Sequence, residues 1–186
     1  MARIAIHGFG RIGRSLMKAG LKHNLFTPVS VSDIKELSTL AALFEADTNY
    51  GRWHEEVRAT DTGFVIGGRE IAYFDSSKEL PDWRALEIDV VIDCTGRATT
   101  RAGAQAHLDR GAKRVLVSAA SKTREDADAF LLPGINLDSF DPEKHKIISM
   151  ASCTTNALAA VVKVMLENFG IRYGLFSTVH AYTNTQ

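Results

Sequence analysis

The sequence predicts an α/β fold built on a doubly wound parallel sheet with a hairpin insertion. Short apolar runs alternate with helical segments, and strand–helix–strand units of this kind build parallel sheets. Residues 56–73 interrupt the alternation with β-type runs broken at Thr62-Gly63 and Gly67-Gly68, a pattern typical of antiparallel hairpins. Of the 186 residues, 45% are hydrophobic and 24% charged, as is usual for a folded globular chain.

Each expected strand is a short run with apolar residues on both faces, as buried parallel strands require. The expected strands are residues 3–7, 29–33, 88–93, 114–118, 147–150 and 175–182. The expected helices are residues 14–23, 38–45, 100–110 and 155–169, and a polar loop is expected over 119–129. We expect a nucleotide-binding domain over 1–150 and, over 151–186, the incomplete start of a second, α+β domain with a helix and its first strand.

The charge balance excludes several classes of function. The 22 basic residues equal the 22 acidic ones and form no block, which argues against a nucleic-acid partner. No apolar run approaches the ~18–20 residues of a membrane span, and the N-terminus lacks the apolar core of a secretion signal. We therefore expect a cytoplasmic protein with no membrane partner. The two cysteines have no metal-ligand spacing, so no metal is expected.

A glycine-rich turn follows the first expected strand. Gly8, Gly10 and Gly13 form a G-x-G-x-x-G pattern before a helix, and Asp33 ends the next strand 20 residues later. Such glycines allow a tight turn, close approach of a pyrophosphate and close packing of helix on strand. The helix N-terminus favours phosphate, and a carboxylate at the position of Asp33 binds ribose hydroxyls but repels a 2′-phosphate. The pattern predicts a Rossmann-type domain that binds NAD.

Cys153 stands at the start of an expected helix, where N–H groups and the helix dipole favour a thiolate. The hydroxyls of Ser152, Thr154 and Thr155 flank it and either cap the helix or bind an anion. Cys94 follows a buried strand and is expected in the core. The two cysteines are therefore expected to differ in reactivity.

Among the histidines, His180 is a candidate base for the Cys153 thiol, if the fold brings the two together. Histidines on strands are more often structural, and sequence spacing does not settle this. His7 is expected to pack at a strand end, and His107 is expected in a surface or loop position. These histidines predict no second cluster.

Several segments, in order along the chain, resemble phosphorylating glyceraldehyde-3-phosphate dehydrogenase. The two most specific are Ser152-Cys153-Thr154-Thr155-Asn156 and His180-Ala181-Tyr182-Thr183, and the interval between cysteine and histidine also matches the family. The other matching segments are residues 8–14, 32–33, 47–52, 94–96, 111–115, 118–122 and 184–186.

The resemblance implies a mechanism and a set of site residues. Cys153 would attack the aldehyde, and His180 would lower the thiol pKa and exchange protons. The product would be 1,3-bisphosphoglycerate, formed with NAD and inorganic phosphate in glycolysis. Residues implied in cofactor binding are Gly8, Gly10, Arg11, Ile12, Gly13, Asp33, Thr95, Gly96 and Ser118. Residues implied in binding glyceraldehyde 3-phosphate or inorganic phosphate are Ser152, Thr154, Thr183 and Thr185.

The chain also departs from the family. Ala98 replaces a large apolar residue that walls the adenine pocket, Ala120 replaces a proline, and Ala157 replaces a second cysteine. The family's chains continue well beyond Gln186, so the family's homotetramer is not expected here. Two alternatives stay open: an erythrose-4-phosphate dehydrogenase, and an NAD-binding module without turnover.

Overall fold

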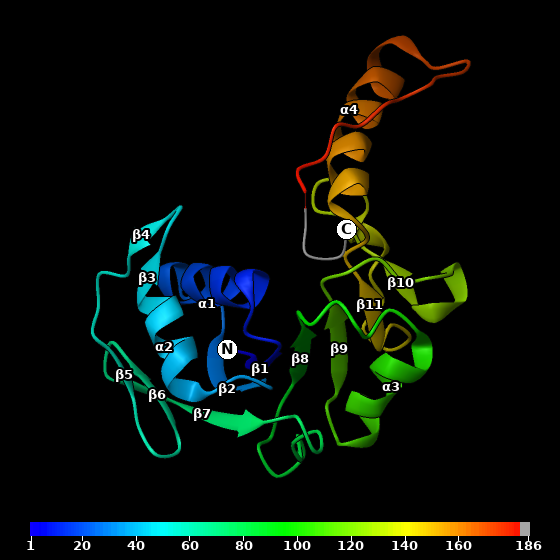
Figure 1. The fold of residues 1–186 in the computed structure, drawn as a ribbon. Coiled ribbons are helices and arrows are strands. Elements are labelled where there is room, and N and C mark those ends of the chain that lie inside the picture. Colours follow the sequence, from blue (N-terminus) through cyan, green and yellow to red (C-terminus); the bar gives the residue numbers. More distant parts are fainter. Residues whose placement is uncertain (183–186) are drawn as a thin grey trace.

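The computed structural model describes residues 1–182 and contains a nine-stranded mixed sheet (Figure 1). The strand order is β10-β11-β9-β8-β1-β2-β7-β6-β5. The strands of this sheet are β1 (Arg3–His7), β2 (Thr27–Asp33), β5 (Val57–Ala59), β6 (Gly63–Ile66), β7 (Arg69–Asp75), β8 (Val90–Asp93), β9 (Arg114–Val117), β10 (Ala129–Phe130) and β11 (Ile147–Ser149). A separate antiparallel pair consists of β3 (Ala46–Asp47) and β4 (Gly51–Arg52).

The sheet is parallel from β10 to β7, and the predicted hairpins extend it at one edge. β5, β6 and β7 are antiparallel neighbours, and β7 pairs in parallel with β2. The turn between β6 and β7 uses Gly67 and Gly68, both at positive φ, which a tight hairpin favours. The predicted fold class is therefore confirmed.

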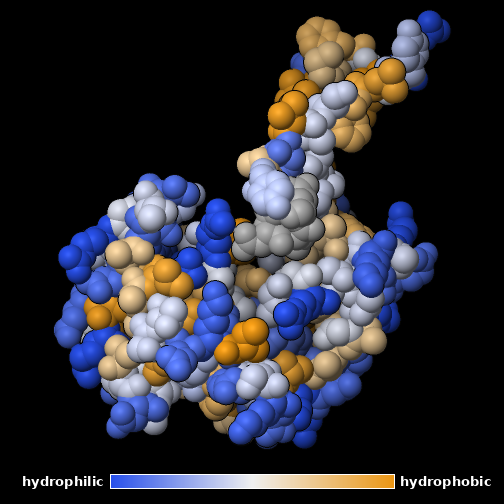
Figure 2. Space-filling model, viewed as in Figure 1, coloured by the Kyte–Doolittle hydropathy of each residue, from blue (hydrophilic) through white to orange (hydrophobic). Residues whose placement is uncertain are grey.

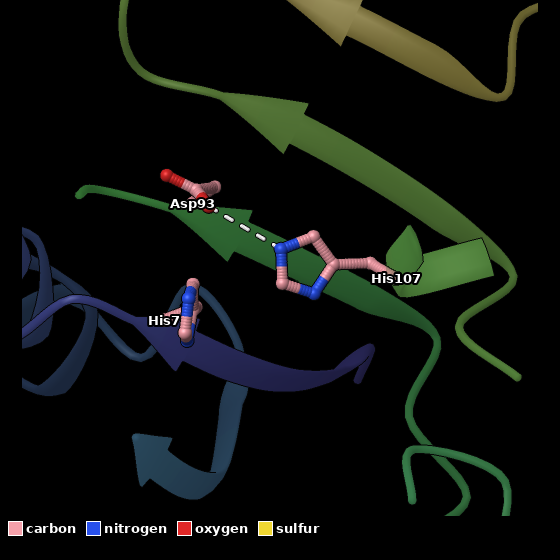
Figure 3. A group of neighbouring side chains, drawn as sticks. All are labelled: His7, Asp93 and His107. Carbon is pink, nitrogen blue, oxygen red and sulfur yellow. Dashed lines mark hydrogen bonds and ion pairs between the residues drawn. The ribbon is translucent and has the colours of Figure 1, made fainter. Parts of the chain in front are cut away.

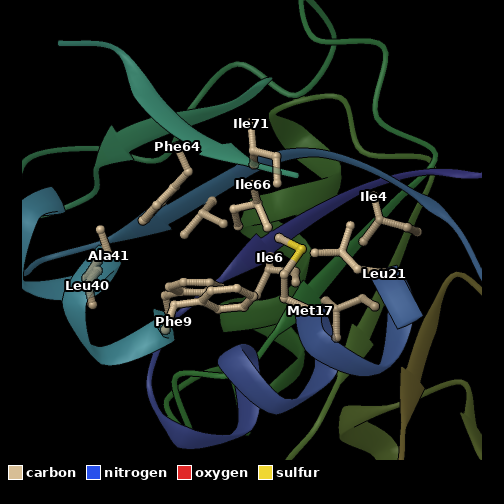
Figure 4. Close-up of a cluster of buried hydrophobic side chains, with 13 residues drawn as sticks. Ile4, Ile6, Phe9, Met17, Leu21, Leu40, Ala41, Phe64, Ile66 and Ile71 are labelled. Atoms are coloured by element: carbon tan, nitrogen blue, oxygen red, sulfur yellow. The ribbon is translucent and has the colours of Figure 1, made fainter. Parts of the chain in front are cut away.

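Helices cover both faces of the parallel sheet. The helices on these faces are α1 (Arg11–His23), α2 (Leu37–Glu45) and α3 (Arg101–Asp109), whereas α4 (Cys153–Phe169) follows β11 and covers neither face. Short 3₁₀ turns lie at Arg124–Asp126 and Leu137–Ser139. Ile4 and Ile6 pack in one core cluster with Met17 of α1 and Phe44 of α2 (Figure 4). Ala5, between them on β1, faces the opposite side, because neighbouring residues of a strand point to opposite faces.

Helix boundaries differ from the predicted ones mainly at the N-termini. α1 begins at Arg11 instead of residue 14, and α4 begins at Cys153 instead of residue 155. Each helix therefore starts inside the motif that was expected to precede its apolar residues. The N-terminal turns carry few apolar residues, which hides them from a periodicity argument. The 119–129 segment, predicted as a loop, also contains a 3₁₀ turn and the first residue of β10.

α4 projects from the sheet, and residues 170–182 run back beside it (Figure 1). None of the residues of α4 is buried, and Phe169 is 77% exposed. Figure 2 shows apolar side chains gathered on this projection. Within residues 1–182, no helix combines the length and the apolar character that a bilayer-spanning helix requires.

The predicted strand at 175–182 is wrong for the described residues. They form no strand, and none of the strands described in residues 1–182 pairs with them. An alternating apolar pattern forms a strand only when another strand supplies hydrogen bonds, and this segment lies beside a helix instead.

Candidate active site

The glycine turn lies between β1 and α1, at the carboxyl edge of the sheet. Gly8 has φ +88°, and a Cβ there would lie 2.7 Å from the backbone nitrogen of Thr95. A Cβ on Gly13 would lie 2.2 Å from the carbonyl oxygen of Gly8. Only a glycine at this position allows α1 to pack so closely against the turn. Gly10 instead faces open space, with no atom within 4 Å of a Cβ.

Asp33 ends β2 beside this turn. Its carboxylate accepts hydrogen bonds from the backbone N–H groups of Phe9 at 2.6 Å, Ile34 at 2.8 Å and Lys35 at 3.1 Å. These bonds fix the orientation of the carboxylate toward the turn. Each carboxylate oxygen has two lone pairs, so the group can still accept from ribose hydroxyls.

A cavity of about 380 Å³ opens at this edge of the sheet. Of the residues predicted to bind the cofactor, Gly8, Gly10, Asp33 and Thr95 line it. The open space over Gly10 is the feature that a pyrophosphate needs, because a side chain there would occupy the approach to the α1 N-terminus. The residues present therefore fit a dinucleotide.

The other predicted cofactor residues lie at the same edge but outside the lining of the cavity. Arg11 and Ile12 form the exposed first turn of α1, and Ile12 is 57% exposed. Gly96 follows β8 at φ +73°, and Ser118 follows β9, with its N–H bonded to the Asp93 carbonyl at 2.9 Å. Ala98 is buried and lines the cavity, where a larger side chain would reduce it.

Cys153 is the first residue of α4, directly after β11 at this same edge. Ser152 caps the helix, because its hydroxyl accepts from the Thr155 N–H at 3.0 Å. The Asn156 amide donates to the Met150 carbonyl at 2.9 Å and so ties the helix start to the end of β11. The helix N-terminus presents the thiol to solvent with the N–H groups that favour its anion.

His180 contacts the thiol. The Cys153 Sγ and His180 Nε2 atoms are 3.2 Å apart, and His180 Nδ1 lies 2.7 Å from the Ala181 carbonyl oxygen. The hydrogen bond from His180 lowers the pKa of Cys153 below its ordinary value. The Ala181 carbonyl and the thiol together raise the pKa of His180. Both shifts favour a thiolate–imidazolium pair.

Cys94 differs from Cys153 in every respect that governs reactivity. It packs against the main core cluster, and burial raises the pKa of its thiol to about 12. Its side chain belongs to the strand end after β8, with no helix start near it. Cys94, expected in the core, is half-buried at the edge of the core and lines the cavity.

The predicted phosphate-binding residues are only partly described. Ser152 uses its hydroxyl in the helix cap, and its oxygen also lies 2.7 Å from the Thr155 hydroxyl. Thr154 lies beside Cys153, and its hydrogen bonds contribute to the lowered pKa of that thiol. Thr183 and Thr185 lie outside the described residues.

The sequence argument missed a buried cluster of His7, Asp93 and His107 in the wall of the cavity (Figure 3). The expectation of a surface or loop position for His107 is wrong, because this side chain is 2% exposed and lies on the buried face of α3. Its spacing of three residues from the buried Ala104 places both on one helix face. That periodicity was the available signal.

Two family models match this chain. The profile of the glyceraldehyde 3-phosphate dehydrogenase NAD binding domain matches residues 2–101, and that of the C-terminal domain of the same enzyme matches residues 152–186. The chain is 46% identical to glyceraldehyde-3-phosphate dehydrogenase of Kitasatospora aureofaciens over 189 aligned residues, which cover 100% of this chain and 56% of the relative.

Two further relatives show the same extent of similarity. Identity is 42% to glyceraldehyde-3-phosphate dehydrogenase 2 of Bacillus subtilis and 44% to glyceraldehyde-3-phosphate dehydrogenase 1 of Trichormus variabilis, each over 99% of this chain and 54% of the relative. The chain thus spans about half the length of these curated relatives. Since matches of this kind extend over the whole chain, it belongs to the glyceraldehyde-3-phosphate dehydrogenase family, whose first domain binds NAD.

Proposed function

We propose that this protein oxidises and phosphorylates glyceraldehyde 3-phosphate to 1,3-bisphosphoglycerate with NAD, as a cytoplasmic enzyme of glycolysis. The observation that carries the proposal is the 3.2 Å contact between Cys153 and His180 at the start of α4. Cys153 comes shortly after β11 in the chain, at the same edge of the sheet as the cavity beside the glycine turn. The proposal divides the chain into a cofactor domain, 1–150, and a catalytic part, 151–186.

The first step uses the Cys153 thiolate. Its sulfur bonds the aldehyde carbon, and the carbonyl oxygen takes a proton from His180 to give a thiohemiacetal. The shifted pKa values of both groups supply the anion and the proton donor that this step needs. The free N–H groups at the α4 N-terminus favour negative charge on the oxygen as the bond forms.

In the second step, His180 takes back the hydroxyl proton while the carbon loses a hydride. NAD, when bound, supplies the hydride acceptor. A thioester on Cys153 remains, and an oxygen of inorganic phosphate attacks its carbonyl carbon. The thiolate then leaves as the acyl phosphate forms, so Cys153 returns to its starting state.

Named residues would hold the reactants. Gly8, Gly10, Gly13 and Asp33 shape the dinucleotide site, because the turn is open only over Gly10 and Asp33 is oriented toward it. The remaining cofactor residues proposed are Arg11, Ile12, Thr95, Gly96 and Ser118. The proposed phosphate-binding residues are Ser152, Thr154, Thr183 and Thr185.

A single-turnover experiment tests the proposal. The chain is mixed with NAD and glyceraldehyde 3-phosphate without inorganic phosphate, and NADH absorbance is followed. We expect one NADH per active chain and an acyl adduct on Cys153 in the mass spectrum. NAD binding without a burst would contradict the proposal and favour the NAD-binding module without turnover.

The same assay separates the two sugar phosphates. We expect a faster burst with glyceraldehyde 3-phosphate than with erythrose 4-phosphate, since the segment from His180 to Gln186 resembles the former enzyme more closely. The reverse order of rates would establish the erythrose-4-phosphate alternative.

A further inference from the structure

His7 and Asp93 lie at the topological switch point of the sheet, where successive connections leave β1 toward opposite edges. From β1 the chain continues to β2 on one side, while β8 lies on the other side of β1. His7 and Asp93 are the last residues of β1 and β8, and they are paired in register. Ligands of open α/β sheets bind outside the carboxyl ends of the strands at such a switch point. Both side chains line the cavity.

Both oxygens of the Asp93 carboxylate have partners within the protein. It accepts from the Thr95 N–H at 2.9 Å and the Thr95 hydroxyl at 2.7 Å, and it lies 3.3 Å from His107 Nε2. Burial raises the pKa of Asp93, but hydrogen bonds from His107 and Thr95 outweigh this effect and hold the pKa below its ordinary value. Asp93 is therefore an ionised group that positions the Thr95 turn.

His107 is locked in one tautomer. The Trp83 indole nitrogen lies 3.2 Å from His107 Nδ1, and an indole N–H only donates. Nδ1 must accept, so the ring proton is on Nε2 and points to Asp93. Although ligand atoms of His7, Asp93 and His107 lie within 4.8 Å of one another, this tautomer leaves His107 no lone pair for a cation. The cluster is a hydrogen-bonded chain that ends at Asp93.

His7 is the member of the cluster with a ring nitrogen left over. Its Nδ1 lies 2.7 Å from the Ser32 hydroxyl, and its ring packs edge-on against His107 with centroids 4.9 Å apart. In the part of the chain that the structure describes, Nε2 has no hydrogen-bond partner. Burial lowers the pKa of His7 below its ordinary value and outweighs the opposing charges of Asp93 and Asp33. His7 is thus a neutral imidazole at the cavity.

We propose that His7 is a further dinucleotide-contacting residue, whose Nε2 hydrogen-bonds a hydroxyl or phosphate oxygen of the cofactor at the switch point. The inference rests on the proposed NAD site. Ser32 fixes the ring through Nδ1, and the His107 ring packs against it. Because the His7 ring is already held by these two contacts, little side-chain entropy is lost when Nε2 binds the cofactor.

Two substitutions separate the ring nitrogens. His7→Asn places an amide near the position of Nδ1 and so keeps the bond to Ser32, but it removes Nε2. His7→Gln extends an amide to the position of Nε2. Calorimetric titration with NAD should show affinity about five- to tenfold weaker for His7→Asn, the effect of one lost hydrogen bond, and within about twofold of wild type for His7→Gln.

The outcomes are distinct. Wild-type affinity in His7→Asn, or equal weakening in both variants, overturns the inference. A wild-type chain that does not bind NAD contradicts the proposed function itself and removes the inference with it. A second measurement needs no variant: NAD should shift the pH titration of the His7 ring proton signal in NMR spectra of the wild-type chain. An unchanged titration would also overturn the inference.

Discussion

The sheet and the α4 projection use apolar side chains in opposite ways. In the sheet domain, Met17 of α1 is 0% exposed and packs into the largest core cluster. In α4, Leu166 is 58% exposed although the helix is 17 residues long. The first helix is held by tertiary packing, while the second is defined by its Ser152 cap and by Gly170 at its end.

The same difference separates the two cysteines. The packed domain places Cys94 against its core, where burial opposes ionisation. The exposed start of α4 places Cys153 against His180, where ionisation is favoured. The surroundings of each thiol therefore decide how readily it ionises.

Substitution of the two cysteines should affect the NADH burst very differently. Cys153→Ser should reduce the NADH burst at least about 10³-fold, because a serine hydroxyl stays protonated beside His180. Cys94→Ser is the matched control and should retain the burst. Stopped-flow absorbance with both variants measures the effect. Loss of the burst in both variants, with the fold intact, would contradict the separation of roles.

Substitutions in the sheet domain and in α4 should change the free energy of unfolding by very different amounts. Phe44 is 0% exposed and stacks with Phe9 at a centroid distance of 5.8 Å, so Phe44→Ala should cost about 3–5 kcal/mol. Leu166→Ala should change the free energy of unfolding by less than about 0.5 kcal/mol, because its side chain is exposed. Urea denaturation followed by circular dichroism measures both. A large cost at Leu166 would show that α4 is packed in solution.

Within the packed domain, Gly8 and Gly10 should respond differently to substitution by alanine. Gly8→Ala should cost about 1–3 kcal/mol, since alanine at φ +88° is strained and its Cβ meets Thr95. Gly10→Ala should change stability by less than about 1 kcal/mol but weaken NAD binding about tenfold, because its methyl enters the open space over the turn. Thermal unfolding and calorimetric titration separate the effects. Unchanged NAD affinity in Gly10→Ala would place the pyrophosphate elsewhere.

Alkylation with iodoacetamide compares the thiols directly. Cys153 should react first at every pH below about 9, and Cys94 should stay unlabelled in the folded chain, because the pKa of Cys153 is lowered and that of Cys94 is raised. His180→Ala should move the alkylation of Cys153 to higher pH. Mass spectrometry of the peptides provides the readout, with the urea-unfolded chain as the control in which both cysteines react alike.

The smallest effect is expected in acid. Because the folded chain holds the pKa of His7 below its ordinary value of 6.5, the unfolded chain binds the proton first as pH falls. Stability should therefore decrease as pH drops below about 6.5, and His7→Asn should flatten this part of the curve. Asp93 contributes in the same direction at lower pH, since its lowered pKa favours the folded state until the carboxylate is protonated. Urea unfolding from pH 7 to 5 measures the slope; equal slopes would rule out His7 as its source.

Much of the fold could be predicted because local patterns and tertiary structure agree. The turn at Gly8, Gly10 and Gly13 has the strand, helix and Asp33 that its pattern requires, and the Gly67-Gly68 turn joins two antiparallel strands. The strand predicted at 175–182 shows where this reasoning stops. Strand pairing depends on a partner distant in sequence, which the local pattern does not contain.

The α/β fold, the dinucleotide turn and the helix start at Cys153 could be read from the chain, since each depends on residues close together along it. The contact of His180 with Cys153 could not, nor could the hydrogen-bonded chain of Trp83, His107 and Asp93 beside His7. These contacts join residues from separate elements. Their geometry follows from how those elements pack, because proximity in space and tautomer choice are set by packing rather than by sequence spacing.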